Sequence, residues 1–351
     1  MVSSGVIKCT TRQLNLDVTL TCGQAFRWKK NDQSEWMSTF AGRVWCLRQD
    51  DDGNLHYRVL NNPNNGLVCP NFDSSQTESR KRKRRRLEVV PHPTEQNEEL
   101  LRDYFQLGVD LEGLYTGWCQ ADPTFRATAS FLPGIRVLRQ EPLEALMAFI
   151  CSSNNNITRI SSMVEKLCTM YGTKLFEGKE GSFYSFPTAS QMDEERVEVE
   201  LREAGFGYRA KYVHGTAKIL TSRGPLWLQS LRGAPYIEAH RQLMELPGVG
   251  AKVADCVCLM ALDKSEAVPV DVHVWRMATQ HYLPHLRSLK NLTALAYKEI
   301  GDHFRECFGC YAGWAQSVLF TSDLRRHAKA NSHSCVVKET EGKGKRLPIS
   351  D

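Results

Sequence analysis

The spacing of hydrophobic residues changes once along the chain, near residue 98. Before that point, short segments with alternating or aromatic residues are separated by turn residues such as Asp51-Asp-Gly53. A period of two places every second side chain on one face of a strand. We therefore predict a twisted antiparallel β-sheet with hairpins, whose segments lie at 26–28, 35–40, 43–47 and 55–60.

From Glu98 onward, the hydrophobic residues recur with the period of a helix, beginning with Leu100, Leu101 and Tyr104. Further helices are expected at 142–152, 157–171, 194–204, 210–220, 235–246, 251–262, 272–281, 292–308 and 312–325. The predicted fold class is therefore α+β. We expect an N-terminal sheet domain at 1–135, a mainly helical domain at 136–327 and a flexible C-terminal tail at 328–351.

The sheet domain carries an insert at 71–97 that is polar, charged and poor in hydrophobic residues, so we predict that it is disordered. It contains seven consecutive basic residues, Arg80 to Arg86. This run is either a solvated loop or a nuclear import signal, and its place in the insert favours import into the nucleus. A role in tethering DNA stays open. Without the run, the net charge of +5 becomes slightly negative, so a nucleic-acid surface must come from local placement of Lys and Arg.

The overall composition is typical of a globular protein, with 42% hydrophobic and 24% charged residues. No hydrophobic run approaches the ~20 residues of a membrane span, and no secretory segment follows Met1. The twelve cysteines have no framework spacing and are expected to be reduced, intracellular thiols. Residues 1–16 contain Lys8 and Arg12 and no acid, which is too weak a signal to predict a mitochondrial pool, so that possibility stays open.

Residues 241–262 predict two helices joined by a tight glycine turn. The first helix is broken by Pro247-Gly248, Gly250 reopens the backbone, and a second helix runs from Ala251 without Gly or Pro. Turn glycines leave amide groups exposed at a helix N-terminus, where the helix dipole is positive. This arrangement favours a phosphate-binding site at Gly248 and Gly250.

Lys252 opens the second helix of this hairpin, which is otherwise mostly hydrophobic. The helix dipole and burial should both lower the pKa of this lysine, and a neutral amine is a nucleophile. Asp271 precedes a further helix, where its carboxylate could cap the helix and also face a developing cation. Each residue alone has a simpler interpretation, a phosphate-binding lysine and a helix cap. Together, after a glycine hairpin, they indicate catalysis.

The hairpin and the aspartate that follows it resemble the signature of the helix-hairpin-helix (HhH-GPD) DNA glycosylases, and in particular their eukaryotic 8-oxoguanine glycosylase family. The similarity extends from about Leu14 to Leu324 with gaps. It rests on LPGVGAKVADCVCLMAL and AVPVDVHVWR, and on GQAFRW (23–28), FICSSNNNITRI (149–160), GFGYRAKY (205–212) and YAGWAQSVLF (311–320).

The resemblance implies a set of contacts to DNA around the damaged base, which such enzymes rotate out of the stack. Asn154, Arg159 and Arg209 match residues that bind the cytosine left behind. Tyr208 matches the wedge that replaces the lost stacking, and His273 matches a phosphate contact. Without the resemblance, the Ser-Ser-Asn-Asn-Asn run would be a helix cap with a polar loop, and His273 an ordinary first-turn residue.

Four further positions match the pocket for the flipped base. Gly23 matches a carbonyl that accepts from N7–H of 8-oxoguanine, a hydrogen that normal guanine lacks. Cys256 and Phe320 match the two faces of the base, and Gln316 its Watson–Crick edge. Taken alone, these residues would be a turn glycine, two core residues and a polar residue. Because Cys256 follows Lys252 by one helical turn, the two could form an ion pair that lowers the thiol pKa.

The resemblance implies a bifunctional glycosylase and AP lyase of base excision repair. Lys252 would displace the base from C1′, Asp271 would stabilise the cationic sugar, and β-elimination from the Schiff base would cut the strand. The expected partner is double-stranded DNA with 8-oxoguanine, and also formamidopyrimidine-guanine, opposite cytosine. We expect a monomer, no membrane partner and no cofactor.

The sequence argues against two alternative functions and against two kinds of metal site. Lys252 argues against a non-catalytic DNA-binding module and against a monofunctional glycosylase that activates water with the aspartate. Cys307 and Cys310 form the one C-x-x-C pair, and only Cys335 follows, so the sequence lacks a set of four cysteines at the spacing of an iron–sulfur cluster. Zinc held by these cysteines and His333 would need an unusual ligand spacing, so we predict no metal.

Overall fold

The computed structural model describes the backbone of residues 3–60 and 93–341, and the side chains of residues 3–60 and 96–326. The basic run at 80–86 and most of the insert predicted for 71–97 lie outside these residues. The prediction of disorder is wrong for residues 93–97, because helix α2 (Pro93–Tyr104) begins there. Pro93 suits a first helical position because its missing N–H is not needed there.

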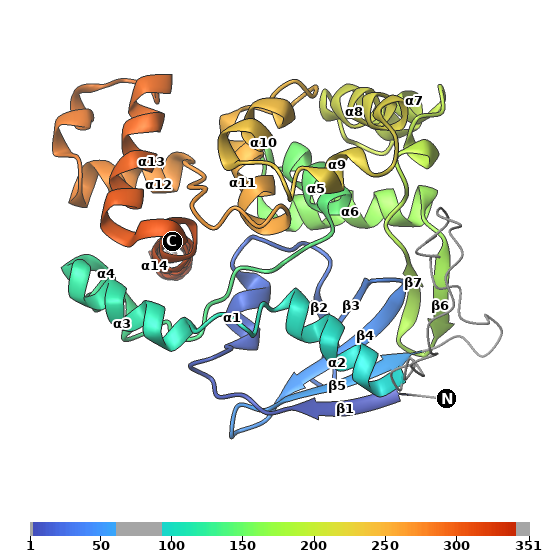
Figure 1. Cartoon of the computed structure of the whole chain (residues 1–351), viewed down its shortest axis with the longest axis horizontal. Helices are drawn as coiled ribbons and strands as arrows, with labels where there is room; N and C mark the ends of the chain where they lie inside the picture. Colours follow the sequence, from blue (N-terminus) through green and yellow to red (C-terminus); the bar gives the residue numbers. More distant parts are fainter. Residues whose placement is uncertain (1–2, 61–92, 342–351) are drawn as a thin grey trace, which may run out of the picture.

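The N-terminal sheet is confirmed as antiparallel and five-stranded, in the order β1-β5-β4-β3-β2 (Figure 1). Its strands are β1 (Ser3–Ile7), β2 (Lys29–Lys30), β3 (Trp36–Phe40), β4 (Arg43–Gln49) and β5 (Leu55–Leu60). One face packs on α2 and on α1 (Leu16–Thr21), a helix that the alternating pattern did not predict. The predicted segment at 26–28 is not a strand and leads into β2.

The other face of the sheet is also covered, by a hairpin that the sequence did not predict. Strands β6 (Lys174–Gly178) and β7 (Gly181–Tyr184) bring Phe176 and Phe183 against Val44 and Cys46 of β4. Strand β4 is therefore buried on both faces, although its alternation suggested one solvated face. Residues 174–184 were missed because a short hairpin in a helical region carries too little periodicity of its own.

The second part of the chain is mainly helical, as predicted. Helices α5 (Pro142–Ser152), α6 (Ile157–Tyr171) and α12 (Val272–His281) have the expected bounds. The other predicted helices are found with shifted ends, as α7 (Val197–Glu203), α8 (Arg209–Arg223), α10 (Tyr236–Leu243), α11 (Ala251–Ala261), α13 (Ala294–Phe308) and α14 (Ala312–Glu341). Helix α14 extends well into the predicted flexible tail, because no Gly or Pro interrupts it before Gly342.

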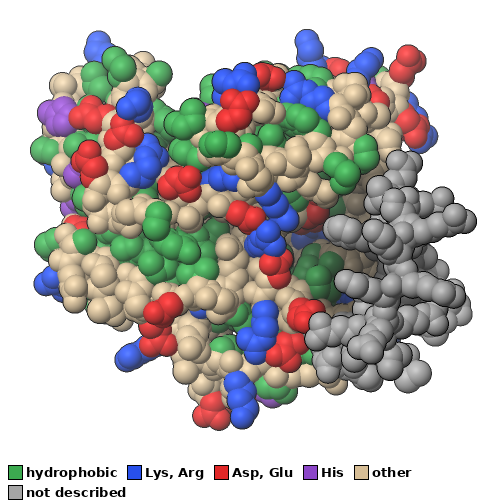
Figure 2. Space-filling view, in the orientation of Figure 1, with side chains coloured by type: hydrophobic (Ala, Val, Ile, Leu, Met, Phe, Trp, Pro, Cys, Tyr) green, Lys and Arg blue, Asp and Glu red, His purple; other side chains and the backbone are tan. Residues whose placement is uncertain are grey.

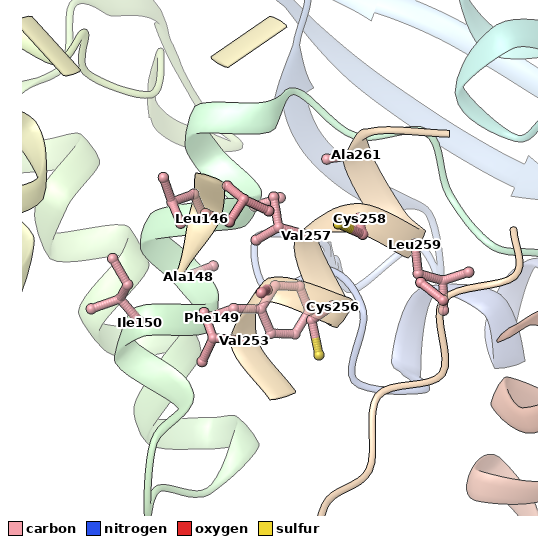
Figure 3. Close-up of a cluster of buried hydrophobic side chains, with 14 of the residues drawn as sticks. Leu146, Ala148, Phe149, Ile150, Val253, Cys256, Val257, Cys258, Leu259 and Ala261 are labelled. Carbon is pink, nitrogen blue, oxygen red and sulfur yellow. The ribbon is translucent and has the colours of Figure 1, made fainter. Parts of the chain in front are cut away.

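Helices α5 and α11 lie side by side at the centre of the helical core (Figure 3). Leu146 and Phe149 of α5 face Val253 and Val257 of α11. Both helices carry an almost continuous run of buried residues, which explains their central position. Side chains at the ends of these two helices, such as Ser152 and Lys252, are therefore attached to a rigidly packed core.

Besides α1, three further helices were not predicted: α3 (Leu111–Ala121), α4 (Pro123–Ala129) and α9 (Trp227–Ser230). The predicted domain boundary at residue 135 places α3 and α4 in the N-terminal domain. Trp118 and Phe125, however, pack against Phe308 of α13 in the helical core. The chain thus returns from the sheet to the C-terminal helices before it enters α5 (Figure 1). Such long-range packing leaves no local mark in the sequence.

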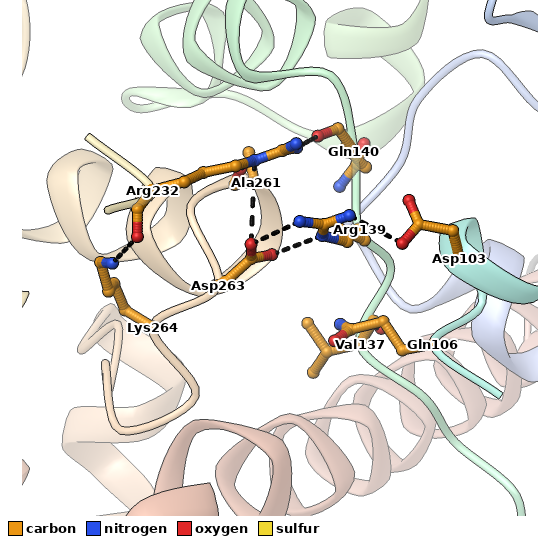
Figure 4. Close-up of polar contacts among 9 residues, drawn as sticks. All are labelled: Asp103, Gln106, Val137, Arg139, Gln140, Arg232, Ala261, Asp263 and Lys264. Carbon is orange, nitrogen blue, oxygen red and sulfur yellow. Dashed lines mark hydrogen bonds and ion pairs between the residues drawn. The ribbon is translucent and has the colours of Figure 1, made fainter. Parts of the chain in front are cut away.

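An ionic cluster joins the sheet domain to the end of α11 (Figure 4). Arg139 donates to both carboxylate oxygens of Asp263, at 2.8 and 2.7 Å, and to Asp103 at 2.7 Å. Asp263 has a φ of +61° just after α11, while Arg232 donates to the carbonyl of Ala261 at 2.8 Å. A two-pronged Arg–carboxylate contact holds geometry as well as distance. The cluster therefore fixes the C-terminal end of α11.

Candidate active site

Two adjoining hollows lie where α5, α11, α12, α14 and the loop after α1 meet. The inner pocket has an empty volume of about 450 Å³, and the outer cleft beside it is wider. The two share the residues Gly23, Phe149, Lys252, Asp271 and Phe320. The inner pocket is completed by Cys22, Gln24, Cys256, Met260, Pro269, Val274, Gln316 and Ser317. Five segments that are far apart in the sequence thus contribute to one site.

The predicted hairpin is formed by α10 and α11, and its two glycines have different roles. Gly248 has a φ of +77°, and a Cβ there would lie 2.7 Å from the side chain of Tyr212. Gly250 is the N-cap of α11 with extended backbone, and a Cβ there would meet no atom within 4 Å. Gly248 is thus required by the fold. Gly250 is not, because its backbone is extended and its surroundings are open.

Lys252 lies in the first turn of α11 and lines both hollows. Its Nζ donates to Ser152 Oγ at 3.2 Å and lies 5.3 Å from the centre of the Phe149 ring. The Ser152 hydroxyl donates in turn to the carbonyl of Phe149 at 2.7 Å, so its lone pairs face the lysine. The last turn of α5 therefore holds the amine at the pocket wall.

Asp271 is the N-cap of α12, so the capping interpretation is confirmed. Its Oδ1 accepts from the amides of His273 and Val274, each at 2.9 Å. The same carboxylate lines the inner pocket together with Lys252. These two amide bonds fix the direction of the carboxylate relative to the pocket.

The loop after α1 forms one wall of the inner pocket. Gly23 has a φ of +82°, which favours glycine, and a Cβ there would lie 3.6 Å from Ile157 and 3.8 Å from Phe320. The buried Gln24 side chain donates to the carbonyl of Arg136 at 2.8 Å and accepts from the amide of Leu138 at 2.8 Å. These hydrogen bonds hold the peptide groups around Gly23 in place.

The remaining pocket residues come from α11 and α14. Gln316 is buried at the pocket wall, and the Phe320 ring meets the His273 ring edge-on at a centroid distance of 5.9 Å. Cys256 is 3% exposed, and burial raises its pKa to about 11 despite the lowering effect of Lys252. The suggested thiolate–lysine ion pair is therefore wrong, because desolvation of a buried thiol outweighs one nearby cation.

The predicted wedge, Tyr208, lies beside the residues predicted to bind the orphan cytosine. Tyr208 is 49% exposed and its hydroxyl donates to the carbonyl of Ser153 at 3.1 Å. Arg209 is 4% exposed; it stacks on the Tyr208 ring at 4.5 Å and donates to the carbonyls of Ser153 and Asn154. Arg159 is exposed and donates to the carbonyl of Gly205 at 3.3 Å. Arg209 thus also shapes the loop, which the sequence could not indicate.

His273, the predicted phosphate contact, lies at the rim of the outer cleft. Its Nδ1 is 3.0 Å from Asp323 Oδ2, and Arg276 donates to the same oxygen at 2.5 Å. Asp323 was missed because it lies 50 positions further along the chain. Phe149 and Ser152 were missed as well, since a hydrophobic helix residue and a serine at a helix end have ordinary structural explanations.

No group of three or more His, Cys, Asp or Glu side chains that could hold a metal ion is found among the described side chains. Cys307 Sγ lies 3.5 Å from His303 Nε2, which is a pair rather than a ligand set. The alternative zinc site would also need His333 and Cys335, whose side chains lie outside the described residues.

Comparison with known proteins places the same regions in two family models. Residues 6–146 match the N-terminal domain of 8-oxoguanine DNA glycosylase, and residues 147–301 match the HhH-GPD superfamily of base excision DNA repair proteins. The chain is 38% identical to an N-glycosylase/DNA lyase OGG1 of Arabidopsis thaliana, over 91% of this chain and 80% of the relative. It is 36% identical to an N-glycosylase/DNA lyase of Saccharomyces cerevisiae, over 91% and 86%.

Solved structures show the same similarity. A Clostridium acetobutylicum 8-oxoguanine glycosylase/lyase, bound to double-stranded DNA with cytosine opposite 8-oxoguanine, is 26% identical, with a TM-score of 0.74. The match covers 93% of this chain and 98% of that one. A structure of MBOgg1 with a low-affinity DNA ligand has the same identity and TM-score, and the match covers 93% of this chain and 96% of that chain.

Proposed function

The chain belongs to the N-glycosylase/DNA lyases of the HhH-GPD superfamily, and from this premise we propose that it excises 8-oxoguanine opposite cytosine through a Schiff base on Lys252. It is thus an enzyme of base excision repair with glycosylase and lyase activity. The observation that carries the proposal is the pair formed by Lys252 and Asp271. Both line one pocket, and each is held in place by hydrogen bonds from a different helix.

The chemistry follows from these two groups. The neutral amine of Lys252 attacks C1′, the bond to the damaged base breaks, and the base leaves with a proton. Asp271 stabilises the positive charge that develops on the sugar, since its carboxylate is fixed by the α12 amides before the reaction begins. Opening of the sugar ring gives a protonated imine. Loss of a C2′ proton then expels the 3′ phosphate, which is β-elimination.

Base recognition is assigned to the wall of the inner pocket. The carbonyl of Gly23 accepts from N7–H of 8-oxoguanine, whereas N7 of normal guanine has no hydrogen to donate. Cys256, as a neutral thiol, and Phe320 contact the two faces of the base. Gln316 binds the Watson–Crick edge. We extend the proposal to formamidopyrimidine-guanine, whose ring-opened nitrogen can also donate.

The proposed partner is double-stranded DNA. Tyr208 fills the gap left by the flipped base, and Asn154, Arg159 and Arg209 bind the orphan cytosine. The phosphate contacts are the amides near Gly248 and Gly250 at the start of α11, and His273 at the cleft rim. Figure 2 shows basic and acidic side chains interspersed on the visible face, so this face does not form one continuous basic surface.

We further propose that the enzyme acts as a monomer in the nucleus, where its DNA substrate is found. The basis for the location is the basic run from Arg80 to Arg86, which lies outside the described residues. A mitochondrial pool is not proposed. No helix in the described part of the chain is long and apolar enough to span a bilayer.

The decisive experiment is sodium borohydride trapping on a duplex with 8-oxoguanine opposite cytosine. Wild type should become covalently joined to DNA, and Lys252→Gln should not, since it lacks the amine. Lys298→Gln is the matched control, because this lysine is 74% exposed on α13 and lines neither hollow. A wild type that binds the duplex but gives no adduct would contradict the proposal. An excision assay would then separate a monofunctional glycosylase from a binding module.

A further inference from the structure

A buried carboxylate beside the pocket takes no part in the proposed chemistry. Asp255 lies on α11 between Lys252 and Cys256 and is 1% exposed. Its two oxygens accept from two tyrosine hydroxyls, Tyr236 Oη to Oδ1 at 2.6 Å and Tyr297 Oη to Oδ2 at 2.5 Å. His240 Nε2 lies 3.6 Å from Oδ1. The carboxylate thus joins α11 to α10 on one side and to α13 on the other.

Tyr297 makes a second contact, to the loop that carries Asp271. Its Oη accepts from the amide of Val270 at 3.3 Å. The single hydroxyl hydrogen is donated to Asp255, so a lone pair is left for this amide. Val270 is buried and directly precedes Asp271. One side chain of α13 therefore connects the helix of Lys252 to the loop of Asp271.

Burying the Asp255 carboxylate lowers the stability of the fold unless its hydrogen bonds offset the loss of solvation. A buried carboxylate is desolvated, and burial raises the pKa of Asp255 in spite of His240 and the two tyrosines. Hydrophobic residues of similar size would pack the same space without this cost. Hydrogen bonds, however, fix direction and register in a way that hydrophobic contacts do not. The two groups that are linked here are the two that must meet the same sugar.

We propose that Tyr297, anchored by Asp255, is a positioning residue that sets the Asp271 loop relative to Lys252. This inference rests on the proposed function of that pair. Tyr297 touches no substrate in this scheme and acts through the Val270 amide. Because small displacements of reacting groups lower rates strongly, loss of this hydroxyl should slow the chemical step and leave DNA binding unchanged.

Two phenylalanine variants form a matched test. Tyr297→Phe removes both contacts of its hydroxyl. Tyr236→Phe removes the other hydrogen bond to Asp255. In the wild type, the Tyr236 hydroxyl donates to this carboxylate and not to the loop of Asp271. Both should lower the unfolding midpoint, Tyr297→Phe by more because it loses two hydrogen bonds, and both should keep the Kd for duplex DNA. Only Tyr297→Phe should slow single-turnover trapping, by about ten- to a hundredfold.

Equal trapping rates in the two folded variants would overturn the positioning role, while a wild type without any adduct would overturn the proposed function itself. If Tyr297→Phe does not fold, Asp255→Leu takes its place. Leucine offers no acceptor, so the Tyr297 hydroxyl loses its anchor and the same loss of rate is expected. A normal rate in folded Asp255→Leu would equally overturn the proposal.

Discussion

Replacing each glycine of the hairpin by alanine should separate a requirement of the fold from a requirement of DNA binding. Gly248→Ala places a Cβ 2.7 Å from Cβ and Cγ of Tyr212, atoms that cannot swing away as a side-chain tip could. The φ of +77° adds about 1–2 kcal/mol of backbone strain for a residue with a Cβ. Overpacking of this kind typically adds about 1–3 kcal/mol. We expect a total loss of about 2–5 kcal/mol in the free energy of unfolding.

Gly250→Ala is the matched control in stability and the test case in binding. Its backbone is extended and its surroundings are open, so the free energy of unfolding should change by less than about 1 kcal/mol. If this turn approaches a phosphate, the new methyl group lies between the amide and the DNA. Affinity for a duplex with an uncleavable abasic analogue should then fall by roughly tenfold, the effect of one lost hydrogen bond.

Urea denaturation and fluorescence anisotropy measure the two quantities independently. If Gly248→Ala unfolds at the wild-type urea concentration, the predicted clash with Tyr212 and the predicted backbone strain are refuted. The assignment of Gly250 to DNA binding is refuted if its alanine variant binds the duplex as tightly as wild type. Reduced stability in Gly250→Ala would instead show that the added methyl group clashes with neighbouring atoms.

Three further predictions concern single contacts. Ser152→Ala removes the acceptor for Lys252 Nζ and should slow single-turnover excision by about tenfold at unchanged Kd; an unchanged rate would exclude this role. Burial favours a raised pKa for Asp263, but hydrogen bonds and charge from Arg139 lower it. Asp263→Asn should therefore cost about 1 kcal/mol above the unfolded-state pKa of about 3.9, and the difference from wild type should vanish as pH falls through the lowered folded value. Urea titrations at several pH values test this, and a constant difference would contradict it. Cys256, with a pKa of about 11, should stay unlabelled by iodoacetamide at pH 7.5 while exposed cysteines react, which peptide mass spectrometry can check; rapid labelling would contradict its assignment as a buried neutral thiol.

Features that depend on neighbouring residues were visible in the sequence. The bounds of α5, α6 and α12 follow from the period of their hydrophobic residues and from local breakers and caps. The hairpin followed from a proline and two glycines within a few positions, and the cap at Asp271 from its place before a helix. Lys252 stood out because a lysine is unusual at the start of a hydrophobic helix.

The surroundings of those residues were decided by tertiary structure alone. Ser152 lies 100 positions from Lys252, and Tyr297 lies 42 positions from Asp255, so each pair meets only because the helices pack against one another. The β6–β7 hairpin was missed for the same reason, since it is stabilised by contacts with β4 rather than by its own pattern. Cys256 shows the electrostatic side of this dependence, because only its burial revealed that its thiol is neutral.

The sequence by itself thus determined most of the longer helices, the sheet and the reactive groups, because periodicity, turn chemistry and capping act over a few residues. The tertiary structure decided how those groups are held in place and, for Cys256, how burial affects its pKa. Hydrogen-bond direction and desolvation depend on distant segments that pack around each group, and one sequence does not display those contacts.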